Sequence, residues 1–136
     1  MKKLVKLENQ SLDDRKILIV DDDDFLLEMY AIKFRQSGFH VEVAQNGKKA
    51  LEQIPVYEPD IILLDVVMPS IDGFEVLSEI KNKKMVPHAT IIMLTNLGQK
   101  DDTERGLRLG ADAYVIKAHF TPTEVVEKVK KMINKK

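Results

Sequence analysis

The chain has 136 residues, the length of one ordinary domain that can bury a hydrophobic core of its own. It contains no cysteine, which excludes disulfides, thiolate metal sites and cysteine nucleophiles. No apolar run approaches the ~20 residues of a membrane span, so we expect a cytoplasmic protein without a membrane partner. The net charge of −1 hides basic ends around an acidic middle, a distribution that argues against nucleic-acid binding.

The first predicted element is a strand at 17–20, an apolar run without polar alternation. Runs of the same kind stand at 61–64, 91–94 and 114–116, and each is short and closed by polar residues. Such runs are typical of parallel strands that are buried on both faces. The run at 40–44 alternates more and fits a strand at the edge of the sheet.

Between the strands the apolar residues follow helical spacing, and each segment has a start signal. Gly38 and Gly110 are typical stop signals for the first and the fourth helix. Before the last helix Thr121 and Glu124 predict a capping box, with Pro122 at the first helical position. The predicted starts are, in chain order, Asp23, Asn46, Asp72, Asp101 and Thr121.

Strands that alternate with helices predict an α/β fold. We expect a doubly wound parallel sheet of five strands with five helices, packed as a three-layer sandwich. This domain is expected at 16–136, behind an N-terminal extension at 1–15. We expect no effector domain after the last helix, so that the domain stands alone.

Polar and charged side chains follow four of the predicted strands directly. Asp21 and Asp22 come after the first strand, Asp65 after the third, Thr95 after the fourth and Lys117 after the fifth. Ligands of such sheets bind beyond the carboxyl ends of the strands, so we expect these side chains to meet at one site. Asp23 and Asp24 are predicted instead to be a helix cap and a first-turn acid.

Carboxylates packed this closely repel one another, and a divalent cation resolves the conflict. Mg²⁺ suits one or two carboxylates and keeps positions open for phosphate oxygens. Lys117 supplies a further positive charge, and Thr95 can donate a hydrogen bond to an oxyanion. The set predicts phosphoryl transfer to a carboxylate, which forms an aspartyl phosphate. Each residue alone fits a turn, a cap or a surface charge, and their joint placement favours a site.

Four sequence blocks, IVDDDD, IILLDVVMPSIDGFE, IIMLTN and AYVIK, resemble those of the response-regulator receiver domain of two-component signalling. The resemblance covers about residues 16–134 and agrees in order, spacing and strand context. It implies the strand order 2-1-3-4-5. It also implies partners: a sensor histidine kinase or a histidine phosphotransfer protein that supplies the phosphoryl group, and an unidentified downstream protein.

By this resemblance Asp65 is the phosphoacceptor. Asp21 and Asp22 correspond to the acidic pair that binds Mg²⁺, together with Asp65 and the backbone carbonyl of Val67. Lys117 corresponds to the lysine that bridges a phosphoryl oxygen and the carboxylate.

The resemblance also implies a switch. Thr95 corresponds to the hydroxyl that follows the phosphoryl group, and Tyr114 to the aromatic residue that turns inward with it. The mobile element is then expected at 95–110, and the output face at the fourth helix, the fifth strand and the fifth helix.

Four positions depart from the family pattern. Ala118 replaces a proline that usually follows a cis bond, and a non-proline cis bond costs ~2.5–4 kcal/mol, so we expect a trans bond here. Asn96 replaces a small residue, and its amide either narrows the entrance or makes its own hydrogen bond. Val67 and Leu97 are apolar where relatives can carry groups that orient the hydrolytic water, which predicts slow self-dephosphorylation.

Two other classes of function remain open at this point. The first is a Mg²⁺-dependent phosphohydrolase similar to haloacid dehalogenases, whose Asp-x-Asp motif Asp21 and Asp23 would have to supply. Turnover of small phosphate esters would identify it. The second is a docking module that is never phosphorylated, against which the intact set of acidic residues, hydroxyl and lysine argues.

Overall fold

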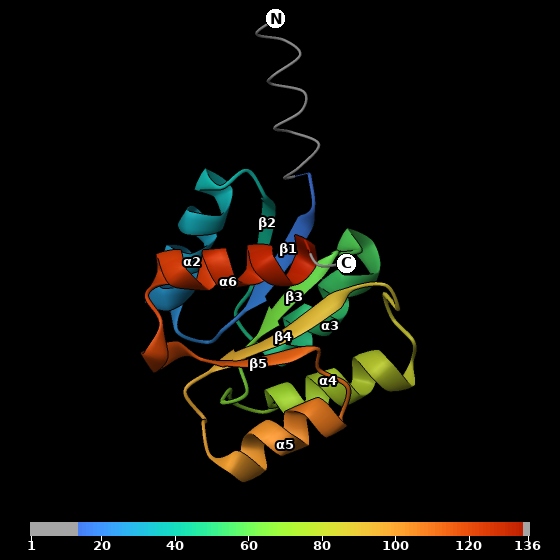
Figure 1. The fold of residues 1–136 in the computed structure, drawn as a ribbon. Helices are drawn as coiled ribbons and strands as arrows, with labels where there is room; N and C mark the ends of the chain where they lie inside the picture. Colours follow the sequence, from blue (N-terminus) through green and yellow to red (C-terminus); the bar gives the residue numbers. More distant parts are fainter. Residues whose placement is uncertain (1–13, 135–136) are drawn as a thin grey trace, which may run out of the picture.

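A computed structural model describes residues 14–134, which form a parallel sheet of five strands flanked by helices (Figure 1). The strands are β1 (Lys16–Val20), β2 (His40–Ala44), β3 (Ile61–Leu64), β4 (Thr90–Thr95) and β5 (Ala113–Ile116). Their order in the sheet is β2-β1-β3-β4-β5, which confirms the predicted order 2-1-3-4-5. Residues 1–13 of the predicted extension lie outside the described residues.

Burial along β1 to β4 follows the pattern expected from their sequences. The run at 114–116 was predicted to be buried on both faces, but β5 is an edge strand in which only Val115 is buried. Every residue of β3 and β4 is buried, and so is all of β1 after Lys16. In β2 exposed and half-buried residues alternate up to the buried Ala44, as expected for an edge strand. Arg15 lies just before β1, and its carbonyl accepts a hydrogen bond from the N–H of His40 at 3.1 Å.

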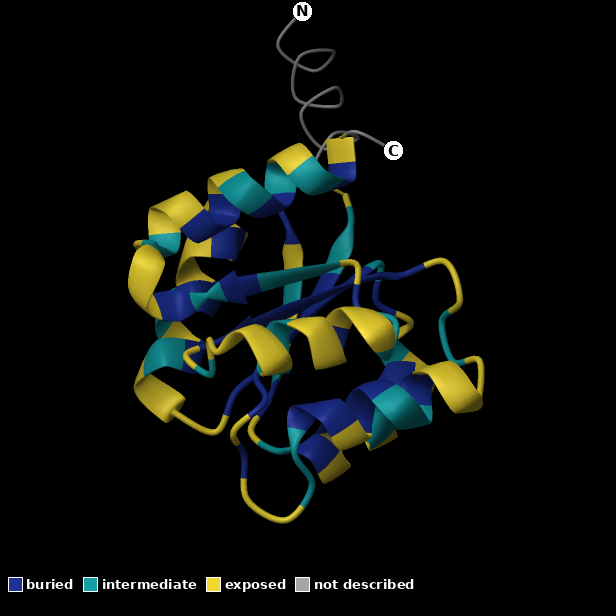
Figure 2. Ribbon diagram, turned by 60° about the horizontal axis from the view of Figure 1, so that its bottom comes forward, coloured by how far each residue is buried: buried dark blue, intermediate teal, exposed yellow. Residues whose placement is uncertain are grey.

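Five α-helices connect and cover the strands, and a short 3-10 turn follows β5. They are α2 (Asp24–Gln36), α3 (Gly47–Tyr57), α4 (Gly73–Asn82), α5 (Lys100–Arg108), η1 (Lys117–His119) and α6 (Pro122–Asn134). Figure 1 shows α2 and α6 on one side of the sheet and α3, α4 and α5 on the other, which confirms the three-layer sandwich. Figure 2 shows the helices exposed on their outer faces and buried toward the sheet.

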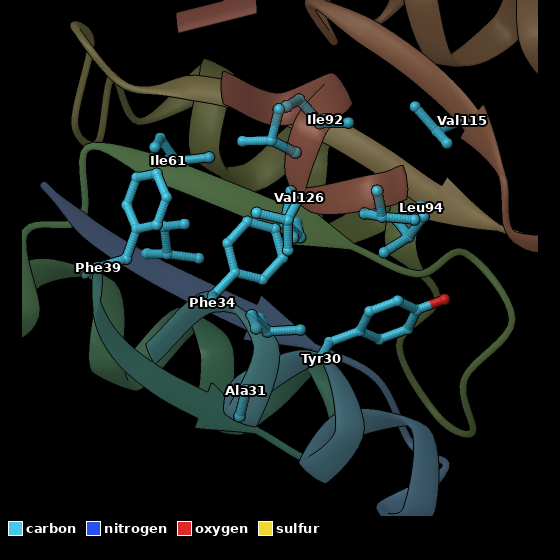
Figure 3. Packing of buried hydrophobic residues seen from close by; sticks show 14 of the residues in the cluster. Tyr30, Ala31, Phe34, Phe39, Ile61, Ile92, Leu94, Val115 and Val126 are labelled. Carbon is cyan, nitrogen blue, oxygen red and sulfur yellow. The ribbon is translucent and has the colours of Figure 1, made fainter. Parts of the chain in front are cut away.

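Alternate residues of the central strands contribute to two separate cores. Ile17 and Ile19 pack with the apolar residues of α2 and α6, whereas Leu18 and Val20 pack with those of α3 and α4. In the first core Phe34 is fully buried, and its ring meets that of Phe39 edge to face with centroids 5.6 Å apart. Figure 3 shows Phe34 of α2 beside Val126 of α6. This packing holds the strands, and hence their carboxyl ends, in fixed register.

Side chains cap most helices where the sequence predicts a start. The carboxylate of Asp23 accepts hydrogen bonds from the N–H groups of Phe25 and Leu26. Asn46 and Asp72 cap α3 and α4 in the same manner.

The fourth and the last predicted helix starts differ in how closely the structure matches them. Thr121 and Glu124 form the predicted capping box, with reciprocal bonds of 2.8 and 3.2 Å. For α5 the predicted start at Asp101 is too late, because the helix begins at Lys100 behind an N-cap, Gln99, whose side chain makes no capping bond. Asp101 instead lies in the first turn, where its charge is favourable near the positive end of the helix dipole.

Candidate functional site

Polar side chains from four strand ends meet in one place, as the sequence predicts. Asp21 follows β1, Asp65 follows β3, Thr95 ends β4 and Lys117 follows β5, and all four are buried. Together they line a pocket of about 370 Å³. The other residues around it are Asp22, Asp23, Leu26, Val67, Asn96 and Leu97. The sequence analysis did not single out Leu26 as a site residue, and its only signal is its place two residues after the acidic run.

The ammonium of Lys117 joins the first and the third strand ends. Its Nζ lies 2.6 Å from Oδ2 of Asp21 and 2.8 Å from Oδ2 of Asp65. Burial lowers the pKa of Lys117, but the bonds to both carboxylates outweigh it and raise the pKa above its ordinary value. Burial also raises the pKa of Asp21, and the bonds from Lys117 and from the N–H of Asp23 offset this only in part. Lys117 therefore stays charged while it holds the two carboxylates together.

Three carboxylates provide donors of the kind that a hard cation needs. Asp21, Asp22 and Asp65 each place one oxygen within 4.8 Å of the other two. Asp21 and Asp65 are buried, whereas Asp22 is exposed at the rim. Three negative charges face the single ammonium of Lys117, so a divalent cation with oxygen ligands would balance the excess. The residues present therefore fit a metal ion, and Mg²⁺ remains a prediction.

Val67 lies beside this cluster, where its carbonyl was predicted to be a metal ligand. Its N–H donates a long hydrogen bond of 3.3 Å to Oδ1 of Asp65, and its side chain is 59% exposed. Leu97 lines the same pocket. Neither side chain carries a polar group that could orient water beside Asp65.

The start of α4 packs closely against the backbone of Asp65 and Val66. The N–H of Gly73, the first residue of α4, donates to the carbonyl of Val66 at 2.8 Å. A Cβ atom at position 73 would lie 2.1 Å from the carbonyl oxygen of Asp65, a distance that no side chain allows. Glycine is therefore required for α4 to begin against the backbone of Asp65 and Val66.

Asp23 is committed to the start of α2. Its carboxylate accepts two backbone N–H groups, at 3.0 Å and 3.1 Å. A phosphohydrolase of the Asp-x-Asp kind would need this side chain free to act as an acid beside the nucleophile. Here the side chain caps the helix instead. The structure therefore gives no support to the phosphohydrolase hypothesis.

The loop after β4 connects Thr95 with Tyr114. The Oγ1 atom of the fully buried Thr95 accepts a hydrogen bond from the N–H of Leu97 at 3.2 Å. The hydroxyl of Tyr114 donates to the carbonyl of Leu97. Burial raises the pKa of Tyr114 to about 12. The two predicted switch residues thus bond to the same loop residue, Thr95 to the N–H of Leu97 and Tyr114 to its carbonyl.

Two of the four positions that depart from the family pattern, Asn96 and Ala118, are hydrogen-bonded to each other. Oδ1 of Asn96 accepts a hydrogen bond of 2.9 Å from the N–H of Ala118. Of the two outcomes expected for Asn96, the structure thus shows the hydrogen bond. The described residues contain no cis peptide bond, so the expected trans bond before Ala118 is confirmed.

Comparisons with known proteins agree with this geometry. Residues 17–130 match the family model described as the response regulator receiver domain. The chain is 36% identical over 122 residues to the alkaline phosphatase synthesis transcriptional regulatory protein PhoP of Bacillus subtilis (strain 168), covering 90% of this chain and 50% of PhoP. The chain spans about half the length of the curated relatives it matches.

Solved structures agree as well. A CheY-like response regulator receiver domain protein from Methanospirillum hungatei JF-1 is 29% identical with a TM-score of 0.81, over 89% of this chain and 94% of that one. The receiver domain of the Francisella response regulator 1452 is 29% identical with a TM-score of 0.80, over 89% and 98%.

The chain belongs to the family of response regulator receiver domains. Members of this family are phosphoacceptor domains of two-component signalling. Within residues 14–134 no helix is long and apolar enough to cross a membrane.

Proposed function

We propose that Asp65 accepts a phosphoryl group from a sensor histidine kinase or a histidine phosphotransfer protein in the cytoplasm, with Mg²⁺ bound by Asp21, Asp22, Asp65 and the carbonyl of Val67. The observation that carries the proposal is the position of Lys117, whose ammonium binds Asp21 and Asp65 at 2.6 and 2.8 Å inside a pocket lined by carboxylates. Residues 16–136 would form the receiver domain behind an extension at 1–15.

The transfer requires one bond to break and one to form. A carboxylate oxygen of Asp65 attacks phosphorus with its electron pair, and the bond between phosphorus and the imidazole nitrogen of the donor breaks. The electron pair of that bond stays on the imidazole nitrogen. Bound Mg²⁺ would supply positive charge next to the phosphoryl oxygens. Lys117 contributes a second positive charge. As the acyl phosphate forms, its ammonium shifts its contact from the Asp65 carboxylate to the phosphoryl group.

The change at Asp65 is transmitted through the loop after β4, to which Thr95 and Tyr114 are hydrogen-bonded. The Oγ1 atom of Thr95 now accepts the N–H of Leu97, and an acyl phosphate at Asp65 offers its hydroxyl a charged acceptor. The loop moves with this exchange, and so does the tyrosine that is bonded to the carbonyl of Leu97. The changed face then binds a downstream partner or passes the phosphoryl group on.

Intact-mass measurement after incubation with acetyl phosphate tests the proposal. We expect the mass of one phosphoryl group to be added in MgCl₂, and no addition in EDTA or in Asp65→Asn. Addition to Asp65→Asn, or equal addition in EDTA, would contradict the assignment. A chain that gains no mass under any condition would favour the docking module.

A matched pair of variants tests the metal ligands. Asp22→Asn removes a proposed ligand, whereas Asp24→Asn removes an exposed carboxylate of the same acidic run that lies in the first turn of α2. We expect the affinity for Mg²⁺ to fall by at least about tenfold in Asp22→Asn and to stay near the parent value in Asp24→Asn. Equal losses in both would show that Mg²⁺ responds only to overall charge.

A further inference from the structure

The hydrogen bond between Asn96 and Ala118 connects the two loops that carry the proposed catalytic hydroxyl and ammonium. Asn96 follows Thr95 at the end of β4, and Ala118 follows Lys117 at the end of β5. The bond measures 2.9 Å and is made by Oδ1 of Asn96 and the backbone N–H of Ala118. It lies one residue beyond Thr95 and one beyond Lys117, directly after the last strand pair, Thr95 with Ile116.

This bond also fixes the orientation of the Asn96 amide. The N–H of Ala118 is a donor, so the carbonyl oxygen of the amide has to face it and the NH₂ group has to face the other way. Asn96 is exposed at the rim of the pocket, and its amide gains this single orientation from a backbone group on the other loop. Residue 118 can donate because it is not proline.

Lys117 directly follows Ile116, the last residue of β5, which pairs with Thr95 of β4. It begins the short turn η1, in which the N–H of Phe120 donates a hydrogen bond of 3.1 Å to the carbonyl of Lys117. Its ammonium end is fixed by Asp21 and Asp65. Phosphoryl transfer changes the contact between Lys117 and Asp65. The bond between Asn96 and Ala118 is then a restraint on the loop of Lys117 just beyond the paired strand ends.

We propose that Asn96 is a positioning residue, which couples the loop of Thr95 to the loop of Lys117. It thereby keeps the hydroxyl of the first and the ammonium of the second at fixed positions in front of Asp65. The consequence for phosphorylation rests on the proposed function. The coupling itself does not, because the same bond orders Lys117 in the unphosphorylated chain. In this role Asn96 acts through its neighbours Thr95 and Ala118.

Three variants separate this role from others. Asn96→Ala removes the acceptor, Asn96→Asp keeps an acceptor oxygen for Ala118 while it removes the NH₂ donors, and Asn82→Ala changes an exposed asparagine at the end of α4 as the matched control. The first readout is nuclear magnetic resonance of the unphosphorylated chain, namely hydrogen exchange of the Ala118 amide and the ¹⁵Nζ signal of Lys117. We expect both to change in Asn96→Ala and to stay near the parent values in Asn96→Asp and Asn82→Ala.

The second readout is the rate of phosphorylation by acetyl phosphate. The maximal rate should fall about two- to tenfold in Asn96→Ala, as expected for loss of one hydrogen bond, with little change in the donor concentration at half-maximal rate. Asn82→Ala should match the parent. An unchanged Lys117 signal in Asn96→Ala would overturn the proposal, and so would an unchanged maximal rate in a chain that is phosphorylated. A parent chain that takes up no phosphoryl group would contradict the proposed function. The Lys117 signal alone would then test whether Asn96 couples the two loops.

Discussion

Gly106 of α5 lies directly against the ring of Tyr114 in β5. A Cβ atom at position 106 would lie 2.8 Å from Cδ2 and 3.0 Å from Cε2 of the ring, so one of the two elements would have to move. We expect Gly106→Ala to displace the ring and to lower the free energy of unfolding by about 1–3 kcal/mol. Urea unfolding measures this change.

A second background controls for the effect of alanine on the helix itself. In Tyr114→Ala the ring is absent, and Gly106→Ala should then raise the free energy of unfolding by up to ~1 kcal/mol, because alanine favours helix over glycine. An equal loss in both backgrounds would show that the ring of Tyr114 is not what excludes a side chain at position 106.

The tyrosines make stability depend on alkaline pH. Burial raises the pKa of all three, Tyr30, Tyr57 and Tyr114, and brings the last two to about 12. In the unfolded chain phenols lose their protons near pH 10, so between pH 10 and 12 the folded chain binds more protons. This contribution to stability is therefore complete below pH 10 and is lost as the pH rises toward 12.

Ultraviolet absorbance of the phenolate, followed together with circular dichroism, checks this expectation. Little phenolate should form near pH 10 while the fold persists. Half-ionised tyrosines at pH 10 in a chain with an unchanged dichroism spectrum would be inconsistent with the buried phenols.

Lys117→Met tests how the buried charges support one another. The substitution leaves Asp21 and Asp65 buried without their ammonium partner, and their repulsion then opposes folding. In EDTA we expect the free energy of unfolding to fall by about 1–3 kcal/mol, less than for a closed interior because the pocket opens to solvent. MgCl₂ should restore part of the loss, since the cation replaces the missing positive charge. Equal stability of parent and variant in EDTA would argue against a structural role of the charge cluster.

The apolar residues at the rim predict a slow loss of the phosphoryl group. Val67 and Leu97 line the pocket, and neither side chain can align a water molecule for attack on an acyl phosphate. We expect the double variant Val67→Asn, Leu97→Glu to lose phosphate about tenfold faster than the parent, measured as release of inorganic phosphate. Val56→Asn, which changes an exposed valine of α3 outside the pocket, should match the parent. If the double variant is as slow as the parent, residues other than these two set the rate.

The sheet and the convergence of the site could be predicted from the sequence because both follow from local patterns. Unbroken apolar runs mark strands that are buried on both faces, and parallel strands bring the residues after their ends to one edge. The structure confirms this for Asp21, Asp65, Thr95 and Lys117, which all line one pocket.

The sequence could not predict the contacts that the loop after β4 makes with β5 and with the turn that follows β5. The hydroxyl of Tyr114 in β5 bonds to the carbonyl of Leu97 in the loop after β4, and Asn96 bonds to Ala118 in the turn after β5. These contacts depend on how the segments around the ends of β4 and β5 face each other, and no spacing in the sequence encodes that. The sequence also did not predict that the N-cap of α5 is Gln99, whose side chain makes no capping bond.

Chemical trapping of the phosphorylated residue tests the central claim most directly. Borohydride reduces an aspartyl phosphate to homoserine, and tandem mass spectrometry of the digested protein then locates the changed residue after incubation with acetyl phosphate and Mg²⁺. We predict homoserine at position 65 and at no other aspartate. Homoserine at position 21 or 22, or a phosphoryl group carried only by histidine, would contradict the account.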